Sequence, residues 1–194
     1  MMKTLFQEIK YSVIGILSLG ILLCGIYPLV TWTVAQVFFH EKANGSLLME
    51  ENQIIGSALL AQGFTGHQYF HPRPSAAGGG YDAVSSGGSN LGPLSRTLSE
   101  MVQKRVDEYR KENGLDADIP VPADAVTSSG SGLDPHISPE NALIQAKRVA
   151  RERGMTDKAM LQKIADHTEG RTLWLFGQPR VNVLTLNCAL DGRL

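Results

Sequence analysis

The 194-residue chain has no excess of either charge, because 18 Lys and Arg stand against 19 Asp and Glu, a formal net charge of −1. A nucleic-acid-binding protein needs a basic surface to neutralise phosphates, so this class is excluded. Two cysteines cannot form the disulfide framework of a small secreted scaffold. Charged residues are also scarce, at 19% against roughly 25% in soluble proteins, which indicates a segment that avoids water.

That segment is the stretch between Tyr11 and Phe39, which contains no Asp, Glu, Lys, Arg or His. As a helix, residues 12–39 would extend about 42 Å at about 1.5 Å each. This is enough to cross a hydrocarbon core of about 30 Å with tilt. A cleavable signal peptide, the main alternative, has a shorter apolar core of about 7–15 residues before its cleavage site. The sequence therefore predicts an uncleaved transmembrane helix over residues 12–39.

The distribution of basic residues around this segment predicts its orientation. Lys3 and Lys10 precede it, and Lys42 follows it closely. Because positively charged flanks stay on the cytoplasmic side, we expect residues 1–11 in the cytoplasm. Residues 40–194 are then expected to form one exported domain outside the membrane.

The predicted helix also carries small residues at helical spacing. Gly15, Ser18 and Gly25 are expected on one face, where the backbone of another membrane helix could approach closely. A partner helix in the membrane is therefore one interpretation. The other is that glycine is simply frequent in membrane helices. Pro28 is expected to kink the helix because it removes a backbone donor.

The exported domain is predicted to be α+β, with a small sheet and about three helices. A helix is indicated where Ser or Thr begins a segment with apolar residues at helical spacing and Gly ends it. The three segments of this kind are Thr97 to Gly114, Ser138 to Gly154, and Thr156 to Gly170. Strand structure is predicted within Gln53–Phe64, and Ile119–Val126 is at best an edge strand because of its two prolines.

Val181–Leu190 closes the predicted sheet. Its leucines alternate with other residues at a period of two, which is typical of a strand. We expect the even-numbered side chains, including Cys188, to face the core.

Between the first strand and the first helix, Gly63–Pro93 contains eight glycines and several aromatic residues. A loop this long within a compact domain is usually functional or disordered, and embedded aromatic residues argue against disorder. Exposed aromatic side chains favour protein interfaces. The predicted partner contacts of this loop are Tyr69, Phe70, Arg73, Tyr81 and Asn90.

Three polar clusters are candidate reactive sites. His67 and His71 have a metal-ligand spacing, but no Cys or carboxylate cluster is near in sequence, so surface loop histidines are the favoured interpretation. Residues 85–90 could form an anion cradle, yet they lack the lysine of a phosphate-binding loop, and a structural turn is favoured. Asp134 and His136 have no accompanying nucleophile motif. No metal ligands and no catalytic residues are predicted.

A second Ser/Gly-rich loop is the candidate for nucleotide contact. It faintly resembles the signature loop of ABC-type ATPases and leads into a predicted helix N-terminus, which suits phosphate. Its residues are Ser129, Gly130, Ser131, Gly132 and Leu133. The predicted orientation places this loop outside, where ATP is scarce.

Together, these segments resemble the KdpC family, the small subunit of the bacterial Kdp potassium-transporting P-type ATPase. The resemblance covers essentially the whole chain and rests on ordered motifs after one N-terminal membrane helix. The matching stretches are GSALLAQGF (56–64), YFHPRPSAAGGGYDAVSSGGSNLGP (69–93), VPADAVTSSGSGLDPHISPENA (121–142), HTEGR (167–171) and GQPRVNVLTLNCAL (177–190).

The resemblance implies a non-catalytic accessory subunit of an ATP-driven, high-affinity potassium-uptake complex in the bacterial inner membrane. The implied partners are a channel-like potassium-translocating subunit, an ATP-hydrolysing P-type subunit and a very small membrane peptide, besides the lipid bilayer. It also implies a catalytic chaperone that raises the ATP affinity of the ATPase subunit. ATP is then the one ligand that the resemblance suggests, and no tightly bound cofactor is expected.

Two other classes of function remain open at this stage. The first is a nucleotide-binding regulator on the cytoplasmic side, with residues 129–133 as its contact. The second is a membrane-anchored exported enzyme. The preferred hypothesis is that the helix docks on the channel-like subunit and the exported domain lies over the outer mouth of that subunit.

Overall fold

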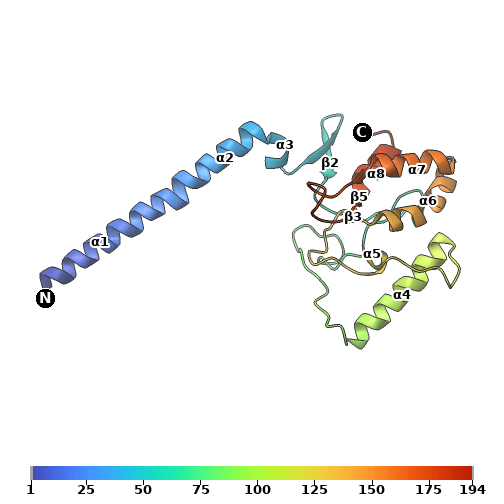
Figure 1. Cartoon of the computed structure of the whole chain (residues 1–194), viewed down its shortest axis with the longest axis horizontal. Helices are drawn as coiled ribbons and strands as arrows, with labels where there is room; N and C mark the ends of the chain where they lie inside the picture. The colour runs from blue at the N-terminus through green and yellow to red at the C-terminus, as the bar shows by residue number, and fades with distance from the viewer. Residues whose placement is uncertain (1, 194) are drawn as a thin grey trace. The chain divides into compact units, whose positions relative to one another are not determined.

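The computed structural model describes residues 2–193 and divides the chain into two units, Met1–Leu47 and Leu48–Leu194 (Figure 1). The first unit is dominated by a long apolar helix. The second combines several helices with two small sheets. This combination confirms the predicted α+β class with a single N-terminal membrane-type helix.

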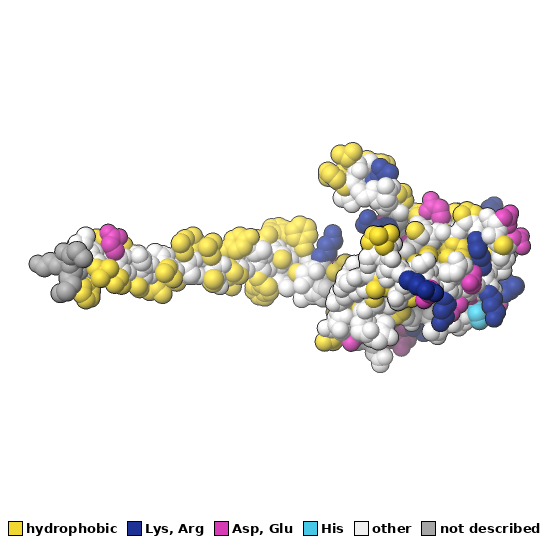
Figure 2. All heavy atoms as spheres, turned by 90° about the horizontal axis from the view of Figure 1, so that it is seen from below, with side chains coloured by type: hydrophobic (Ala, Val, Ile, Leu, Met, Phe, Trp, Pro, Cys, Tyr) yellow, Lys and Arg dark blue, Asp and Glu magenta, His cyan; other side chains and the backbone are white. Residues whose placement is uncertain are grey.

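The long helix consists of α1 (Met2–Gly20), the π-helical segment η1 (Ile21–Ile26) and α2 (Tyr27–Phe38). Residues Thr4–Phe38 are long and apolar enough to cross a membrane, with a mean hydropathy of 2.4. Hydrophobic side chains line this helix along most of its visible surface in Figure 2. The helix also includes residues 2–11, which were predicted to lie in the cytoplasm.

The π-helical segment ends two residues before Pro28, which has no N–H to donate and whose ring crowds the preceding turn. The wider hydrogen-bonding pattern of η1 accommodates this proline. Gly15 and Ser18 lie in α1, and Gly25 lies in η1. A face shared by these three small residues stays a prediction.

A short helix, α3 (His40–Ala43), and a hairpin follow. The strands β1 (Leu47–Glu50) and β2 (Gln53–Ser57) form a two-stranded sheet. Both residues of the connecting turn, Glu51 and Asn52, have positive φ, as the tight turns of hairpins require. The strand predicted within residues 53–64 is confirmed, and it ends at residue 57.

The three predicted helices are present as α4 (Arg96–Asn113), α6 (Pro139–Arg153) and α7 (Asp157–Asp166). Both α4 and α6 end at a glycine in the left-handed conformation, as predicted.

Side-chain hydrogen bonds to backbone N–H groups confirm the predicted N-caps Ser138 and Thr156. The predicted cap Thr97 is wrong. The Ser95 side chain accepts the hydrogen bond from the N–H of Leu98 instead, so α4 begins two residues earlier than expected.

The second sheet has three very short antiparallel strands in the order β3-β5-β4. They are β3 (His136–Ile137), β4 (Thr168–Glu169) and β5 (Arg180–Asn182). No strand forms over Ile119–Val126, whose end is instead the short helix α5 (Ala123–Val126).

The predicted strand Val181–Leu190 is wrong over most of its length. Only β5 is extended, and α8 (Val183–Leu190) begins where the Asn182 side chain accepts a hydrogen bond from the N–H of Thr185. Both odd- and even-numbered side chains are buried along α8, so the rest of the domain encloses this helix. A short enclosed helix lacks a polar face, and its leucine spacing therefore imitated the alternation of a strand.

The hydrophobic core lies between α6, α7, α8 and the three-stranded sheet. Ala142, Ala146, Val149 and Ala150 are buried on α6. On α7, Met160 and Ile164 are buried, whereas Leu161 and Ala165 are exposed. Further core residues come from outside α6 and α7: Phe70, Ile137, Val181, Val183 and Leu186.

Candidate functional site

Residues 67–71, here called the clamped segment, run from the exposed His67 into the interior at Phe70 and pair with neither sheet. The N–H of Phe70 donates to Asn187 Oδ1 at 2.9 Å, and Asn187 Nδ2 donates to the Phe70 carbonyl at 2.9 Å. The next residue is held in the same manner. The N–H of His71 donates to Gln145 Oε1 at 2.8 Å, and Gln145 Nε2 donates to the His71 carbonyl at 3.1 Å. Side-chain amides thus replace a neighbouring strand.

Two arginines of α6 complete this arrangement. Arg148 donates to the carbonyls of His67 and Tyr69 at 2.6 and 3.0 Å. Arg153 donates to the carbonyl of Gln68 at 2.7 Å. Five consecutive carbonyls, from residue 67 to residue 71, therefore accept hydrogen bonds from side chains of α6 and α8. A buried carbonyl left without a partner would cost about 1–3 kcal/mol, so these side chains determine the path of the segment.

Two of the clamping side chains on α6, Gln145 and Arg148, form a buried polar stripe at helical spacing together with Asn141. Asn141, Gln145 and Arg148 are all at most 4% exposed. The prediction of α6 from its apolar residues missed this stripe. The sequence does carry a signal for this stripe. Its three polar residues have the spacing i, i+4 and i+7, which places them on one face of a helix next to alanines and a valine.

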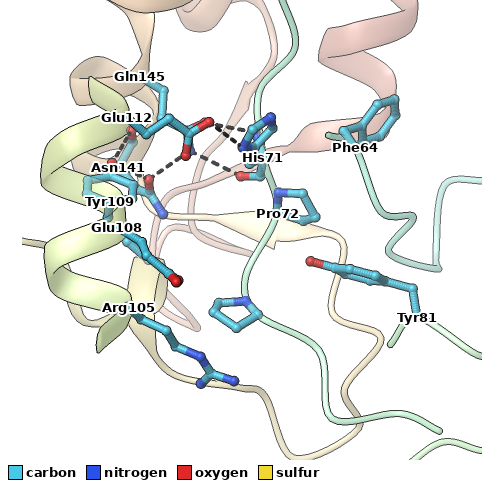
Figure 3. Close-up of a pocket in the computed structure, with 12 residues that line it drawn as sticks. Phe64, His71, Pro72, Tyr81, Arg105, Glu108, Tyr109, Glu112, Asn141 and Gln145 are labelled. Atoms are coloured by element: carbon cyan, nitrogen blue, oxygen red, sulfur yellow. Dashed lines mark hydrogen bonds and ion pairs between the residues drawn. The ribbon is translucent and has the colours of Figure 1, made fainter. Parts of the chain in front are cut away.

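A polar cavity of about 270 Å³ lies beside the clamped segment, between α4, α6 and the glycine-rich loop (Figure 3). Figure 3 shows Glu112 and His71 pointing toward each other, with Tyr109 beside Asn141. Its lining residues are Phe64, His71, Pro72, Pro74, Tyr81, Arg105, Glu108, Tyr109, Glu112, Ala125, Asn141 and Gln145.

The cavity wall contains a histidine–carboxylate pair. His71 Nδ1 lies 3.0 Å from Glu112 Oε1, whereas His67 Nδ1 is 3.9 Å from the same atom. The hydrogen bond from His71 lowers the pKa of Glu112 against the opposing effect of burial. The interpretation of both residues as surface histidines is therefore wrong for His71, which is largely buried, and fits the exposed His67.

The hydroxyl of Tyr109 donates to Asn141 Oδ1 at 2.7 Å and links α4 to the polar stripe. Burial raises the pKa of Tyr109 strongly, so this hydroxyl remains a donor throughout the physiological range. Burial also lowers the pKa of the Arg148 guanidinium, and the nearby Glu112 carboxylate opposes this effect. Within residues 2–193, no group of three His, Cys, Asp or Glu side chains could hold a metal ion.

The predicted partner contacts of the glycine-rich loop have different environments. Phe70 is 0% exposed and belongs to the core, so its side chain is not available to a partner, contrary to the prediction. Tyr69 donates to Asp191 at 3.1 Å and stacks against Arg153. Arg73 pairs with Asp134 at 3.1 Å.

The other two predicted contacts lie further along the loop. The Tyr81 hydroxyl donates to the Arg73 carbonyl at 3.0 Å, which leaves this ring half-buried. Asn90 is exposed and has a positive φ of 50°. Of the aromatic residues predicted as contacts, Tyr69 and Tyr81 keep part of their surface.

The candidate nucleotide loop, residues 129–133, is fastened to the glycine-rich loop. Ser75 and Ser86 donate to the carbonyls of Gly132 and Ser131 at 2.7 and 2.9 Å, and the N–H of Gly87 donates to the same Ser131 carbonyl. Gly132 has a φ of +69°, and an added Cβ would lie 2.6 Å from the Gly87 carbonyl oxygen. The two loops therefore fit together only with glycine at position 132.

Two serine hydroxyl groups of this loop accept hydrogen bonds from the loop's own backbone N–H groups. Ser129 Oγ accepts from the N–H of Gly132 at 2.9 Å, and Ser131 Oγ accepts from the N–H of Leu133 at 3.1 Å. These amides are the donors that a phosphate would need. Nucleotide contact by Ser129, Gly130, Ser131, Gly132 and Leu133 stays a prediction.

Asp134 and His136 are in contact, and their interactions are structural. His136 Nδ1 is 3.4 Å from Asp134 Oδ1, and hydrogen bonds from His136 lower the pKa of Asp134. The neighbouring hydroxyl of Ser138 donates to Asp124 at 2.9 Å, where it caps α6. This geometry does not join a serine to the histidine as a triad requires.

We predict that Asn187→Leu lowers the free energy of unfolding of the domain by about 2–5 kcal/mol, because both backbone groups of Phe70 lose their partner. Chemical denaturation of the full chain in detergent, followed by circular dichroism, measures this change. The matched control is Gln162→Leu on the exposed face of α7, which should change stability by about 0.5 kcal/mol or less. Equal stability of the two variants would contradict the clamping role.

We also predict that Glu112→Gln weakens the acid sensitivity of the domain. The pKa of Glu112 is lowered in the folded state, so its ionised form contributes stability above the unfolded-state pKa. That contribution is lost as the pH falls through the lowered value. The melting temperature of the native chain should therefore fall more steeply between pH 6 and pH 3, measured in about half-unit steps, than that of the variant. Parallel curves would refute this role.

Comparisons with known proteins cover the helix and the domain together. The family model described as KdpC, K+-transporting ATPase, c chain, matches residues 9–192. A potassium-transporting ATPase KdpC subunit from Nitratidesulfovibrio vulgaris is 52% identical over 185 residues, 95% of this chain and 93% of that protein. The Mycobacterium tuberculosis and Myxococcus xanthus subunits of the same name are 55% and 48% identical, covering 86% and 100% of this chain and 88% and 90% of their own lengths. The chain therefore belongs to the KdpC family, the c chain of K+-transporting ATPases.

Proposed function

We propose that this chain is a non-catalytic accessory subunit of an ATP-driven, high-affinity potassium-uptake complex. The observation that carries the proposal is the family match over residues 9–192, which includes both the membrane helix and the domain. The similar proteins of three bacteria are each named as subunits of a potassium-transporting ATPase. In this proposal, translocation and ATP hydrolysis belong to a channel-like subunit and a P-type ATPase subunit, accompanied by a small membrane peptide.

The proposed location is the bacterial inner membrane, with the N-terminus in the cytoplasm and the domain outside. Lys3 and Lys10 before the apolar segment support this orientation. The helix then contacts the channel-like subunit within the membrane. Apart from the adjacent residues and the helix's own backbone, no described atom lies within 4 Å of where a Cβ of residue 15 would be, so a neighbouring helix could approach closely at Gly15.

The domain is proposed to cover the outer mouth of the channel-like subunit through the glycine-rich loop. The surface left on Tyr69 and Tyr81 and the exposed Asn90 support this contact. The internal bonds of Tyr69 and Arg73, to Asp191 and Asp134, hold the loop in one conformation before a partner binds. A loop that is already ordered loses less conformational entropy on assembly.

The resemblance further supports a catalytic chaperone that raises the ATP affinity of the ATPase subunit. A domain outside the membrane cannot touch cytoplasmic ATP. In our proposal, the effect on ATP affinity is a coupling free energy carried by the conformations of the partner subunits. A nucleotide-binding regulator with a cytoplasmic domain is the second candidate function, favoured only by the Ser/Gly composition of residues 129–133.

We predict that a cysteine at position 84 is labelled by a membrane-impermeant maleimide in intact cells. Val84 is 96% exposed, so Val84→Cys presents an accessible thiol on the domain. The native chain is the control, since Cys188 is buried and Cys24 lies in the apolar helix. Labelling only after cell lysis would overturn the outside location and favour the cytoplasmic regulator.

We also predict that omitting this chain from the co-expressed complex abolishes potassium-stimulated ATP hydrolysis at low ATP. The activity of complexes purified with and without the chain, measured over a range of ATP concentrations, tests the proposal. A higher KM for ATP with unchanged kcat would indicate the chaperone role. Complete loss of the partner subunits during purification would indicate a role in assembly. Identical activity would refute both.

A further inference from the structure

The loop between β4 and β5 exposes four consecutive large hydrophobic side chains, here called the apolar tip. Leu173 is 79% exposed, Trp174 95%, Leu175 70% and Phe176 60%. Single exposed hydrophobic residues are ordinary, but a contiguous group of this size is not. The apolar tip is therefore a candidate interaction surface outside the sites described above.

The conformation of the loop holds these side chains outward. Thr172 and Phe176 exchange two backbone hydrogen bonds, each 2.9 Å long, and so close the loop. Inside it, Leu173 and Trp174 have φ values of 53° and 64°. Bulky residues rarely adopt positive φ, and such strain tends to occur at functional positions. In this conformation, the apolar side chains of the loop are exposed to solvent.

The base of the loop is fixed to the sheet. Glu169 pairs with Arg180 across β4 and β5, and their side chains form a 2.7 Å ion pair. Two residues after Arg180, Asn182 Nδ2 donates to the Ala58 carbonyl at 2.8 Å. Ala58 directly follows β2, so β5 lies against the first hairpin of the domain, as Figure 1 also shows. The apolar tip therefore projects from the part of the domain that is nearest in sequence to the membrane helix.

A short connection joins the membrane helix to the domain. The apolar helix ends at Phe38, and the domain unit begins at Leu48. Ten residues span at most roughly 35 Å when extended. The helix therefore tethers the domain to the membrane that it crosses and keeps the domain at a high effective concentration beside that membrane.

The chemistry of the loop matches a membrane interface. Tryptophan prefers the headgroup level of a bilayer, while leucine and phenylalanine enter the outer acyl region. Beside the tip, Arg171 donates to the uncharged Gln178 at 2.9 Å, so its positive charge remains available to an anionic headgroup. We propose that residues Leu173–Phe176 insert into the surface of the bilayer that the chain's own helix crosses, and thereby fix the domain against the membrane.

Tryptophan fluorescence of the full chain tests this proposal. In a Trp32→Phe variant, Trp174 is the only tryptophan. The chain is reconstituted into vesicles of phosphatidylcholine and phosphatidylglycerol, with and without brominated lipid. We expect quenching of Trp174 by the brominated lipid, and several-fold weaker quenching by aqueous acrylamide than at a water-exposed site. The test is independent of orientation, because lipid is present on both faces of the vesicle membrane.

The matched control places the tryptophan at Val84, which is 96% exposed, in a Trp32→Phe, Trp174→Phe background. This tryptophan should be quenched by acrylamide and insensitive to brominated lipid. The same behaviour at Trp174 would overturn the proposal. Shielding of Trp174 only after the other subunits of the complex are added would also overturn it, in favour of a protein contact. None of these outcomes depends on the proposed transport function, since the chain is measured alone.

Discussion

The fold of this domain depends on satisfying the backbone of residues 67–71 without a neighbouring strand. Its strands contain only two to five residues, too few to provide a partner for every extended segment in the interior. Asn187 and Gln145 supply the missing donors and acceptors from helices on either side. Phe70 can then enter the core between them. The chain thus uses a few buried polar side chains where other α+β domains use a wider sheet.

This arrangement also connects the candidate sites. Gln145 binds the backbone of His71, whose imidazole meets Glu112 in the cavity wall. Gln145 Nε2 also donates to Asn141, which in turn accepts from Tyr109 of α4. A continuous hydrogen-bond network therefore runs from the core to the glycine-rich loop and the cavity. Such networks specify one arrangement of the core, because each partly satisfied alternative leaves a polar group buried.

The sequence allowed the prediction of those features that depend on local chemistry. The charge-free helix, the caps at Ser138 and Thr156 and the left-handed glycines all follow from neighbouring residues. Contacts distant in sequence were not predictable in this way, because nothing near Phe70 indicates a partner 117 positions away. The final helix was mistaken for a strand since burial on all sides removes the polar face that distinguishes a helix. The apolar tip was missed because its exposure depends on tertiary structure.

The separation between Phe70 and Asn187 has a consequence for biosynthesis. The ribosome synthesises the clamped segment long before the residue that must bind it, and α8 is the last helix of the chain. Until then, the glycine-rich loop and the first hairpin have no completed core on which to pack. Contacts of such long range form slowly, because a large loop must be closed before they contribute. The core around Phe70 is therefore completed only after Asn187 has been synthesised.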